Sequence, residues 1–344
     1  MSINASTGDR VILTNIKEVA EIASARGDRA VMAAAGRLGF FRQCLRADLV
    51  IIDNDHWRVY LAALVRPWRR FGLVSVDLIL RAPATFRERL LAKLKALALS
   101  QVDKFIFYFK DTAGYERCYG IKPRQIVYVP FKPNGKDQPV WPSTIPEGEY
   151  ALCAGRTMRD VTTFVQAMAI TGCPAVLLQQ PADIMREHGT DDWREDLPPN
   201  VKLVIHEDGK LETFLSFIAK AKLVVIPRYA RDIGCTGIST YLMGMALGKC
   251  VIISKGPGVD DLLTDEVAVV PPEDAQALAA TVSRLWHDDI ERWKIATCGK
   301  RYADSLGDTA RLCGDILAQS LLCLESRETF QPTDKAKPGC ADAA

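Results

Sequence analysis

The sequence lacks several features that would assign it to a common class of protein. It has no uncharged apolar run of about 18 residues, the length that a membrane-spanning helix needs. Residues 1–10 are polar and contain no apolar segment of the kind found in signal peptides. Basic and acidic side chains nearly balance, at 44 and 42, so no strong overall charge points to nucleic acid. We therefore expect a cytoplasmic protein without a nucleic-acid partner.

Motifs for metal and cofactor chemistry are missing as well. The ten cysteines are spread along the chain without a Cys-x-x-Cys pair, and the four histidines do not have metal-ligand spacing. Neither a dinucleotide-binding glycine motif nor a P-loop is present. Cysteines within apolar runs, such as Cys153, suit a reducing compartment, where they behave as small hydrophobic residues. The sequence thus predicts neither a metal nor a cofactor.

What the sequence does contain is a regular alternation of short β-branched runs and longer amphipathic segments. This alternation is typical of an α/β protein with parallel sheets. Four prolines between Phe131 and Gly148 interrupt it, because such a run forms neither a helix nor a central strand. The 344 residues suffice for two domains. We expect Rossmann-like domains at 1–135 and 150–307, joined by a linker at 136–149 and followed by a helix at 308–325 and a disordered tail at 326–344.

The expected elements describe two doubly wound sheets. The first half predicts strands at 10–14, 30–34, 48–52, 73–80, 104–109 and 126–129, and helices at 16–25, 38–46, 58–69, 85–100 and 112–119. The second half predicts strands at 150–154, 175–179, 201–205, 222–227, 250–254 and 267–270, and helices at 160–170, 211–219, 238–247, 274–287, 290–305 and 308–324. In such proteins a ligand binds at the carboxyl ends of the strands, here in a cleft between the domains.

The loop after the expected strand at 222–227 is the most informative segment. It is polar and contains glycine, and a helix is expected to begin near Ile238. Unpaired backbone N–H groups at the positive end of a helix dipole suit an anion such as a phosphate. The residues that would bind it are Gly237, Ile238, Ser239 and Thr240. The alternative is a plain strand-to-helix connection in which Thr236 caps the helix.

Several blocks in the second half resemble the group 1 family of GT-B glycosyltransferases, which includes glycogen-synthase-like and mannosyltransferase-like enzymes. They are residues 242–252, 256–260 and 269–278, in the family's order and spacing, preceded by a strand and basic loop at 153–160. The resemblance implies the GT-B fold, in which two Rossmann-like sheets face each other across a cleft. It also implies a nucleotide-diphosphate sugar as donor, a site that works without a metal ion, and a last helix that crosses back to the first domain.

The resemblance also implies roles for single residues. The basic loop of the family supports the leaving diphosphate, which assigns that role to Arg156 and Arg159, with Arg156 favoured. The alternative is an ordinary surface pair beside a helix cap at Asp160. The family usually carries two glutamates at the positions of Cys235 and Met243, so this chain lacks both.

Recognition of the nucleoside must then come from other residues. His206 and Glu207 follow the expected strand at 201–205, which makes them candidates by position. Asp208 is better explained as a solvated turn residue.

The first domain is expected to hold the acceptor. A polar cluster at 53–57 follows a buried strand, where α/β proteins place functional groups. His56 can act as a base near neutral pH, and Asp55 can orient it or take the proton itself. The alternative is that Asp55 or a neighbour caps the next helix, which leaves His56 exposed. Asp77 is a weaker candidate for the same role.

The segment from Trp57 to Lys95 is rich in basic and aromatic residues. A helix with apolar residues on one side and arginines on the other suits an anionic lipid surface, although such a helix is more commonly an ordinary solvated one. We expect possible partners to include an anionic membrane surface, with peripheral attachment at its inner face.

Together these features predict a hexosyltransferase. Its partners are a nucleotide sugar and a saccharide or lipid-linked saccharide acceptor, as in polysaccharide or glycoconjugate biosynthesis. Two alternatives are a catalytically silent GT-B partner protein, favoured by the missing glutamates, and a GT-B sugar-nucleotide epimerase, which needs acid and base carboxylates in the cleft.

Overall fold

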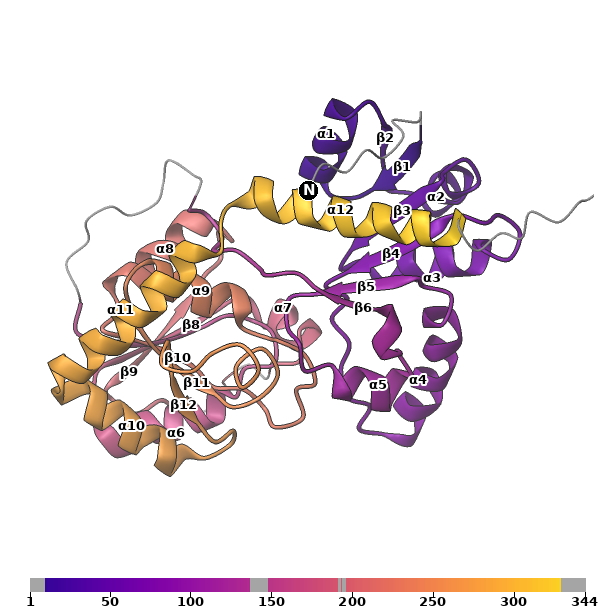
Figure 1. Ribbon diagram of the computed structural model, residues 1–344. Coiled ribbons are helices and arrows are strands. Elements are labelled where there is room, and N and C mark those ends of the chain that lie inside the picture. Colours follow the sequence, from indigo (N-terminus) through magenta and orange to yellow (C-terminus); the bar gives the residue numbers. More distant parts are fainter. Residues whose placement is uncertain (1–9, 137–147, 191–192, 194–195, 329–344) are drawn as a thin grey trace, which may run out of the picture.

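The chain folds into two domains that lie side by side, and a long carboxyl-terminal helix runs from the second back to the first (Figure 1). The computed structural model describes residues 10–136, 148–190, 193 and 196–328. Most of the predicted linker at 136–149, and the predicted tail from residue 329 onward, lie outside these residues.

The first domain is built on a parallel six-stranded sheet with the order β2-β1-β3-β4-β5-β6. Its strands are β1 (Val11–Thr14), β2 (Arg29–Met32), β3 (Leu49–Asp53), β4 (Gly72–Val76), β5 (Lys104–Phe107) and β6 (Ile126–Tyr128). Its helices are α1 (Lys17–Ala25), α2 (Arg37–Cys44), α3 (His56–Val65), α4 (Phe86–Leu99) and α5 (Ala113–Tyr119), with a 3₁₀ turn at Pro123–Gln125.

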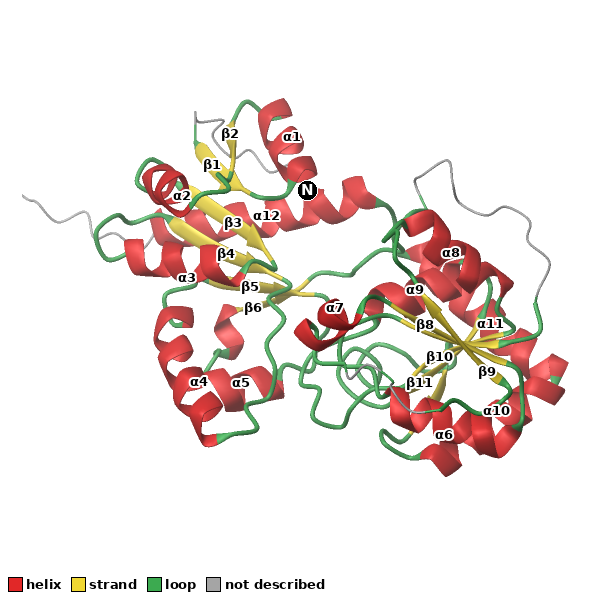
Figure 2. Ribbon diagram, turned by 180° about the vertical axis from the view of Figure 1, so that it is seen from behind, coloured by secondary structure: helices red, strands yellow, loops and turns green. Residues whose placement is uncertain are grey.

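Apolar residues on both faces of the strands explain why this sheet is sandwiched between helices. In β3, Val50 and Ile52 join a core with α2, α3, α4 and α5, whereas Leu49 and Ile51 join a core on the opposite face. A strand buried on both sides reads as a continuous apolar run, as expected for a parallel sheet. Figure 2 shows the helices on the two sides of these strands.

The second domain repeats this architecture with the strand order β12-β11-β10-β7-β8-β9. Its strands are β7 (Ala151–Ala154), β8 (Ala175–Gln179), β9 (Val201–Ile205), β10 (Leu223–Ile226), β11 (Cys250–Ser254) and β12 (Ala268–Val270). Its helices are α6 (Val161–Thr171), α7 (Ala182–Glu187), α8 (Leu211–Lys220), α9 (Ile238–Ala246), α10 (Ala275–His287) and α11 (Asp289–Ser305). All strand pairs in both sheets are parallel, so the predicted fold class is confirmed.

The last helix, α12 (Thr309–Glu328), returns from the second domain to the first. Ile316, Leu317 and Leu321 are buried in one core with Ile12 and Val74 of the first sheet. Burying a leucine or isoleucine stabilises a fold by about 1.5–3 kcal/mol. The helix is therefore an integral part of the first domain's packing.

Some expected elements differ from the observed ones. The strand expected at 73–80 ends at Val76, because Asp77 has a φ of 44° that is incompatible with an extended strand. The helix expected at 58–69 begins two residues earlier and ends at Val65. Helix α7 was not expected, since its six residues are too few to show a helical period.

Candidate active site

Two neighbouring cavities lie between the domains. The cavity of about 380 Å³ lined by Arg159 and the start of α9 is called the donor cavity, and the cavity of about 620 Å³ lined by His56 and Lys95 the acceptor cavity, after the roles expected from the sequence. Ile79 and Thr157 line both of them, so the two cavities adjoin at these residues. The predicted site residues that line the donor cavity are Arg156, Arg159, His206, Gly237, Ile238, Ser239 and Thr240. These segments are far apart in the sequence, and the fold brings them together.

The amino-terminal end of α9 forms one wall of the donor cavity. Among the described residues, no hydrogen-bond acceptor is found for the N–H groups of Ile238, Ser239 and Thr240, whereas Tyr241 N–H bonds to the Gly237 carbonyl at 2.9 Å. Gly237 precedes the helix with a φ of 100°, a conformation that glycine adopts without strain. The alternative in which Thr236 caps this helix is wrong, because its hydroxyl donates to Asp232 instead.

A buried ion pair holds the loop that carries this helix end. The Arg228 guanidinium lies 3.0 Å from the Asp232 carboxylate, and both side chains are almost fully buried. Asp232 also accepts from Gly234 N–H at 3.0 Å, and Arg228 donates to the Gly234 carbonyl at 3.0 Å. A buried pair with its remaining hydrogen bonds satisfied fixes the geometry of a loop. The position of the free amides of α9 therefore depends on this pair.

Arg159 lies inside the donor cavity, with 2% of its surface exposed. It donates to the carbonyls of Ala154 and Thr157 at 3.0 and 2.8 Å, and its outer nitrogen is 3.5 Å from the Thr240 hydroxyl. No carboxylate of the described residues forms an ion pair with it. Burial lowers the pKa of its guanidinium to about 10, so it remains cationic at neutral pH. A buried charge of this kind calls for an anionic partner.

Arg156 takes a different position from Arg159. It is exposed, and its nearest side-chain partner is the Gln180 amide oxygen at 3.4 Å. The preference for Arg156 over Arg159 is thus not supported by the geometry, because Arg159 alone of the two is held rigidly by backbone carbonyls. The local reason is the turn between them, in which Met158 has a φ of 52° and Asp160 caps α6 by accepting from Thr163 N–H at 3.0 Å.

The two predicted nucleoside-binding residues are separated by the structure. His206 is buried, lines the donor cavity and stacks on Phe214 with ring centroids 6.1 Å apart. Glu207 is exposed and does not line the cavity, because successive side chains after β9 point in opposite directions. Asp208 closes the turn by accepting from Lys210 N–H at 3.0 Å. It is a turn residue, as expected.

Asp77 is the feature of this site that the sequence indicated only weakly. It follows β4 directly and lines the donor cavity, and it is the sole carboxylate among the described lining residues. Burial, and then the neighbouring Asp53 carboxylate, raise the pKa of Asp77 well above its usual value. A strained backbone at φ 44° combined with a shifted pKa is typical of functional sites.

The cluster at 53–57 is divided between two roles. The Asp55 carboxylate caps α3 by accepting from Arg58 N–H at 3.2 Å, forms an ion pair with the Arg58 side chain and lines neither cavity. The assignment of a catalytic role to Asp55 is therefore corrected, because its oxygens are engaged at the helix end. His56 lines the acceptor cavity. Burial and the nearby Lys95 charge lower the pKa of His56, which keeps its imidazole neutral near pH 7.

One segment of the chain is similar to a known family. Residues 186–288 match the family model described as glycosyl transferases group 1. HepE from Anabaena, solved with UDP and glucose, has a TM-score of 0.65 at 15% identity, over 92% of this chain and 100% of HepE. The chain has the GT-B fold, and its segment 186–288 is similar to group 1 glycosyltransferases. The predicted resemblance and enzyme class, glycosyltransferase, are confirmed.

Two further structures of this fold are similar over nearly their whole length. Sucrose-phosphate synthase from Thermosynechococcus elongatus has a TM-score of 0.63 at 15% identity, over 93% of this chain and 99% of that protein. A glycosyltransferase from Rickettsia africae has a TM-score of 0.57 at 11% identity, over 94% of this chain and 100% of its own. No curated protein sequence matches the chain.

In this GT-B protein, Cys235 and Met243 both line the donor cavity. These are the positions at which the family resemblance implies carboxylates, so this part of the wall carries neither a charge nor a strong hydrogen-bond acceptor. Burial raises the pKa of the Cys235 thiol, which makes it a poor proton donor at neutral pH.

Neither a metal site nor a membrane-spanning helix is found among the described residues. They contain no group of three or more His, Cys, Asp or Glu side chains arranged to hold a metal ion. No helix among these described residues is long and apolar enough to cross a bilayer. Activity without a metal and a cytoplasmic location stay predictions.

Proposed function

We propose that this protein transfers a hexosyl group from a nucleoside-diphosphate sugar to a hydroxyl group of a saccharide or lipid-linked saccharide. The observation that carries the proposal is the buried, unpaired guanidinium of Arg159 beside the free amides of α9. Negative charge accumulates on the diphosphate as the glycosidic bond breaks. Donors fixed in advance at that point stabilise the transition state more than the bound donor.

The proposed roles follow the cavity walls. Arg159 and the amides of Ile238, Ser239 and Thr240 bind the diphosphate, and Arg156 adds an exposed cation at the rim. His206 and Phe214 border the nucleoside. No metal is required, because these groups together supply the positive charge that a leaving diphosphate needs.

Asp77 is proposed as the group that takes the proton from the acceptor hydroxyl. It stands at the carboxyl end of β4, two residues before Ile79, where the donor and acceptor cavities adjoin. A base at this junction can reach a hydroxyl that enters from the acceptor side. His56, on the acceptor side of the same junction, binds and orients that hydroxyl as a neutral imidazole.

The same features argue against the two alternatives. A silent partner protein has no need to keep an unpaired cation buried, which is energetically unfavourable. An epimerase needs both an acid and a base, and Asp77 is the one carboxylate found among the described residues of the donor cavity.

Calorimetric titration with UDP and UDP-glucose tests this proposal, with the other nucleoside diphosphates as further probes. We expect binding by the wild-type protein and about ten- to hundredfold weaker binding by Gly237→Ala. A Cβ at this position would lie 3.0 Å from Ile226 and 3.2 Å from the Arg159 guanidinium, in a backbone conformation that is strained for alanine by about 1–3 kcal/mol.

Gly172→Ala is the matched control. Gly172 also has a positive φ, of 67°, but it ends α6 and an added Cβ would meet no atom within 4 Å. It should keep the wild-type affinity. If no nucleoside diphosphate binds to the wild-type protein, the proposed function is wrong.

Peripheral membrane attachment is proposed as well, through one side of α4. Four residues at helical spacing, Phe86, Leu90, Leu94 and Leu97, are each more than half exposed, and Phe86 reaches 81%. Arg87 and Arg89 flank this apolar stripe on the same helix. An exposed apolar stripe bordered by arginines is complementary to an anionic bilayer surface.

Sedimentation with vesicles that contain phosphatidylglycerol measures this attachment. Leu90→Gln/Leu94→Gln should weaken binding at least tenfold, since burying each leucine contributes about 1.5–3 kcal/mol. Ile290→Gln removes a residue that is 85% exposed on the second domain and should bind as the wild type does. Equal binding by all three proteins would exclude α4 as the contact.

A further inference from the structure

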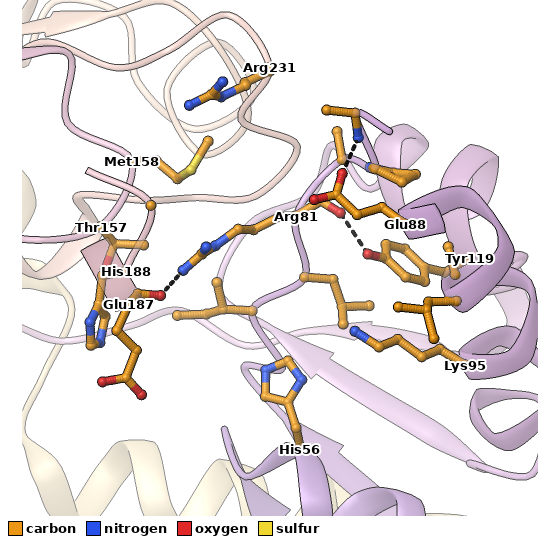
Figure 3. A pocket seen from close by; sticks show the side chains of 18 of the residues that line it. His56, Arg81, Glu88, Lys95, Tyr119, Thr157, Met158, Glu187, His188 and Arg231 are labelled. Carbon is orange, nitrogen blue, oxygen red and sulfur yellow. Dashed lines mark hydrogen bonds between the residues drawn. The ribbon is translucent and has the colours of Figure 1, made fainter. Parts of the chain in front are cut away.

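The acceptor cavity concentrates positive charge from both domains. Figure 3 shows Arg81, Lys95 and Arg231 around the same space, with His56 at one end. Arg81 follows β4, Lys95 lies on α4, and Arg231 belongs to the loop between β10 and α9. Three cations from separate elements meet at one cavity only because the two domains are placed against each other.

Among the described residues, no ion pair joins these three cations to a carboxylate. Within the described parts of the chain, Lys95 forms neither a hydrogen bond nor an ion pair. The Arg81 guanidinium donates to the backbone carbonyl of Glu187 in the second domain. Arg231 lies over the Tyr229 ring, with 4.5 Å between the guanidinium carbon and the ring centroid.

Two glutamates, Glu88 and Glu187, also line the cavity, so the three cations outnumber its carboxylates. The Glu88 carboxylate accepts from Ala84 N–H and Thr85 N–H at 2.7 and 2.9 Å, which lowers its pKa. It completes the capping box of α4, and the charge of Arg231 also contributes to lowering its pKa. The Glu187 side chain is exposed. Burial, followed by the charges of Lys95 and Arg81, lowers the pKa of His56, whereas the Ile79 backbone and Asp55 raise it.

We infer that the acceptor cavity binds a phosphate group carried by the acceptor, held by Lys95, Arg81 and Arg231. Guanidinium and ammonium groups bind phosphate oxygens by charge-assisted hydrogen bonds, and a dianion matches several converging cations better than a neutral sugar does. The inference rests on the proposed function, which places the reacting hydroxyl at the junction of the two cavities. The phosphate then sits on the far side of the acceptor from the bond that forms.

Two sources of phosphate fit this chemistry, a soluble sugar phosphate and the headgroup of a lipid-linked acceptor. The protein is first saturated with UDP, so that Arg159 is occupied, and then titrated calorimetrically with glucose 6-phosphate, inorganic phosphate and glucose. In a second arm, vesicles that contain phosphatidic acid are compared with vesicles of phosphatidylcholine. If the calorimetric binding depends on Lys95, the phosphate comes from a soluble sugar phosphate. If the vesicle binding depends on Lys95, it comes from a lipid headgroup.

Lys95→Met should weaken binding of the phosphate compound, or of the phosphatidic acid vesicles, about tenfold, and Arg231→Met similarly, because each variant removes one charge-assisted contact. Lys93→Met is the matched control, since it removes the same charge from the same helix at a residue that does not line the cavity. Its phosphate affinity and melting temperature should match those of the wild type.

The inference is overturned if Lys95→Met has no effect in either arm, or if Lys93→Met weakens the calorimetric binding of the phosphate compound equally. UDP binding separates this result from a failure of the proposed function. If UDP binds and the Lys95 dependence is absent, the phosphate subsite alone is wrong. If UDP does not bind, the same titrations on the free protein still test the subsite through Lys95.

Discussion

Replacing Arg159 with methionine should lower kcat by about 10²–10³-fold, the usual cost of removing one preorganised donor from a developing anion. Its guanidinium is fixed by the carbonyls of Ala154 and Thr157 and stays charged, so it needs no rearrangement when the diphosphate departs. Arg156→Met should cost about tenfold at most, because that side chain is exposed and its interactions are weakened by solvent. Steady-state rates with the donor found by calorimetry measure both.

A purely structural effect of Arg159→Met is separable from loss of phosphate binding. The variant leaves two buried carbonyls without a donor, which by itself costs about 1–3 kcal/mol each. Titration with UDP and with uridine distinguishes the two effects. We expect the affinity for UDP to fall while the affinity for uridine stays as it was. Equal losses for both ligands, or an unchanged kcat, would contradict the role given to Arg159.

Asp77→Asn should lower kcat by about 10²–10⁴-fold, the contribution typical of general base catalysis. A base must be ionised to act, and burial together with Asp53 raises the pKa of Asp77 well above its usual value. The wild-type rate should therefore rise with pH through that raised pKa. A carboxylate with an ordinary pKa would give a flat profile above about pH 6. Measuring kcat against pH for both proteins tests this.

Stability gives an independent check on Asp77. A carboxyl group whose folded pKa is raised binds its proton more tightly in the folded state, so the fold loses stability as pH rises from the unfolded pKa towards the folded one. The variant Asp77→Asn cannot ionise at this position, so its fold does not lose this stability as pH rises. The variant should melt at the wild-type temperature or above it at pH 8, although its activity is low. A lower melting temperature at pH 8 would mean that the side chain serves the fold instead.

The variant His56→Gln tests which residue causes kcat to rise with pH. If Asp77 is the base, the rise persists in this variant with a lower kcat and a higher KM, because an orienting group is lost. If the rise of kcat with pH is lost in His56→Gln but kept in Asp77→Asn, then His56 is the base and Asp77 the orienting group.

Several parts of the site could be predicted from short stretches of sequence. The amides at 238–240 follow from a buried strand, a loop with glycine and a helix in direct succession, and the caps at Thr85 and Asp160 follow from residue type and spacing. These features depend on the backbone over a few residues. Asp55 shows the limit of this approach, because capping a helix and catalysis use the same carboxylate, and only its partners in the fold distinguish them.

The sequence by itself determined the two parallel sheets, the free amides at the start of α9 and the likeness to group 1 glycosyltransferases, because periodicity, turns and helix ends are local. Tertiary structure decided which charges are buried and what they face. Arg159 and Arg156 are equivalent in the sequence, yet packing buries one and exposes the other. Asp77 ends an apolar run that looks like a longer strand, and Lys95 and Arg231 line one cavity although they belong to different domains. Burial and charge partners arise from segments distant along the chain, so no local pattern contains them.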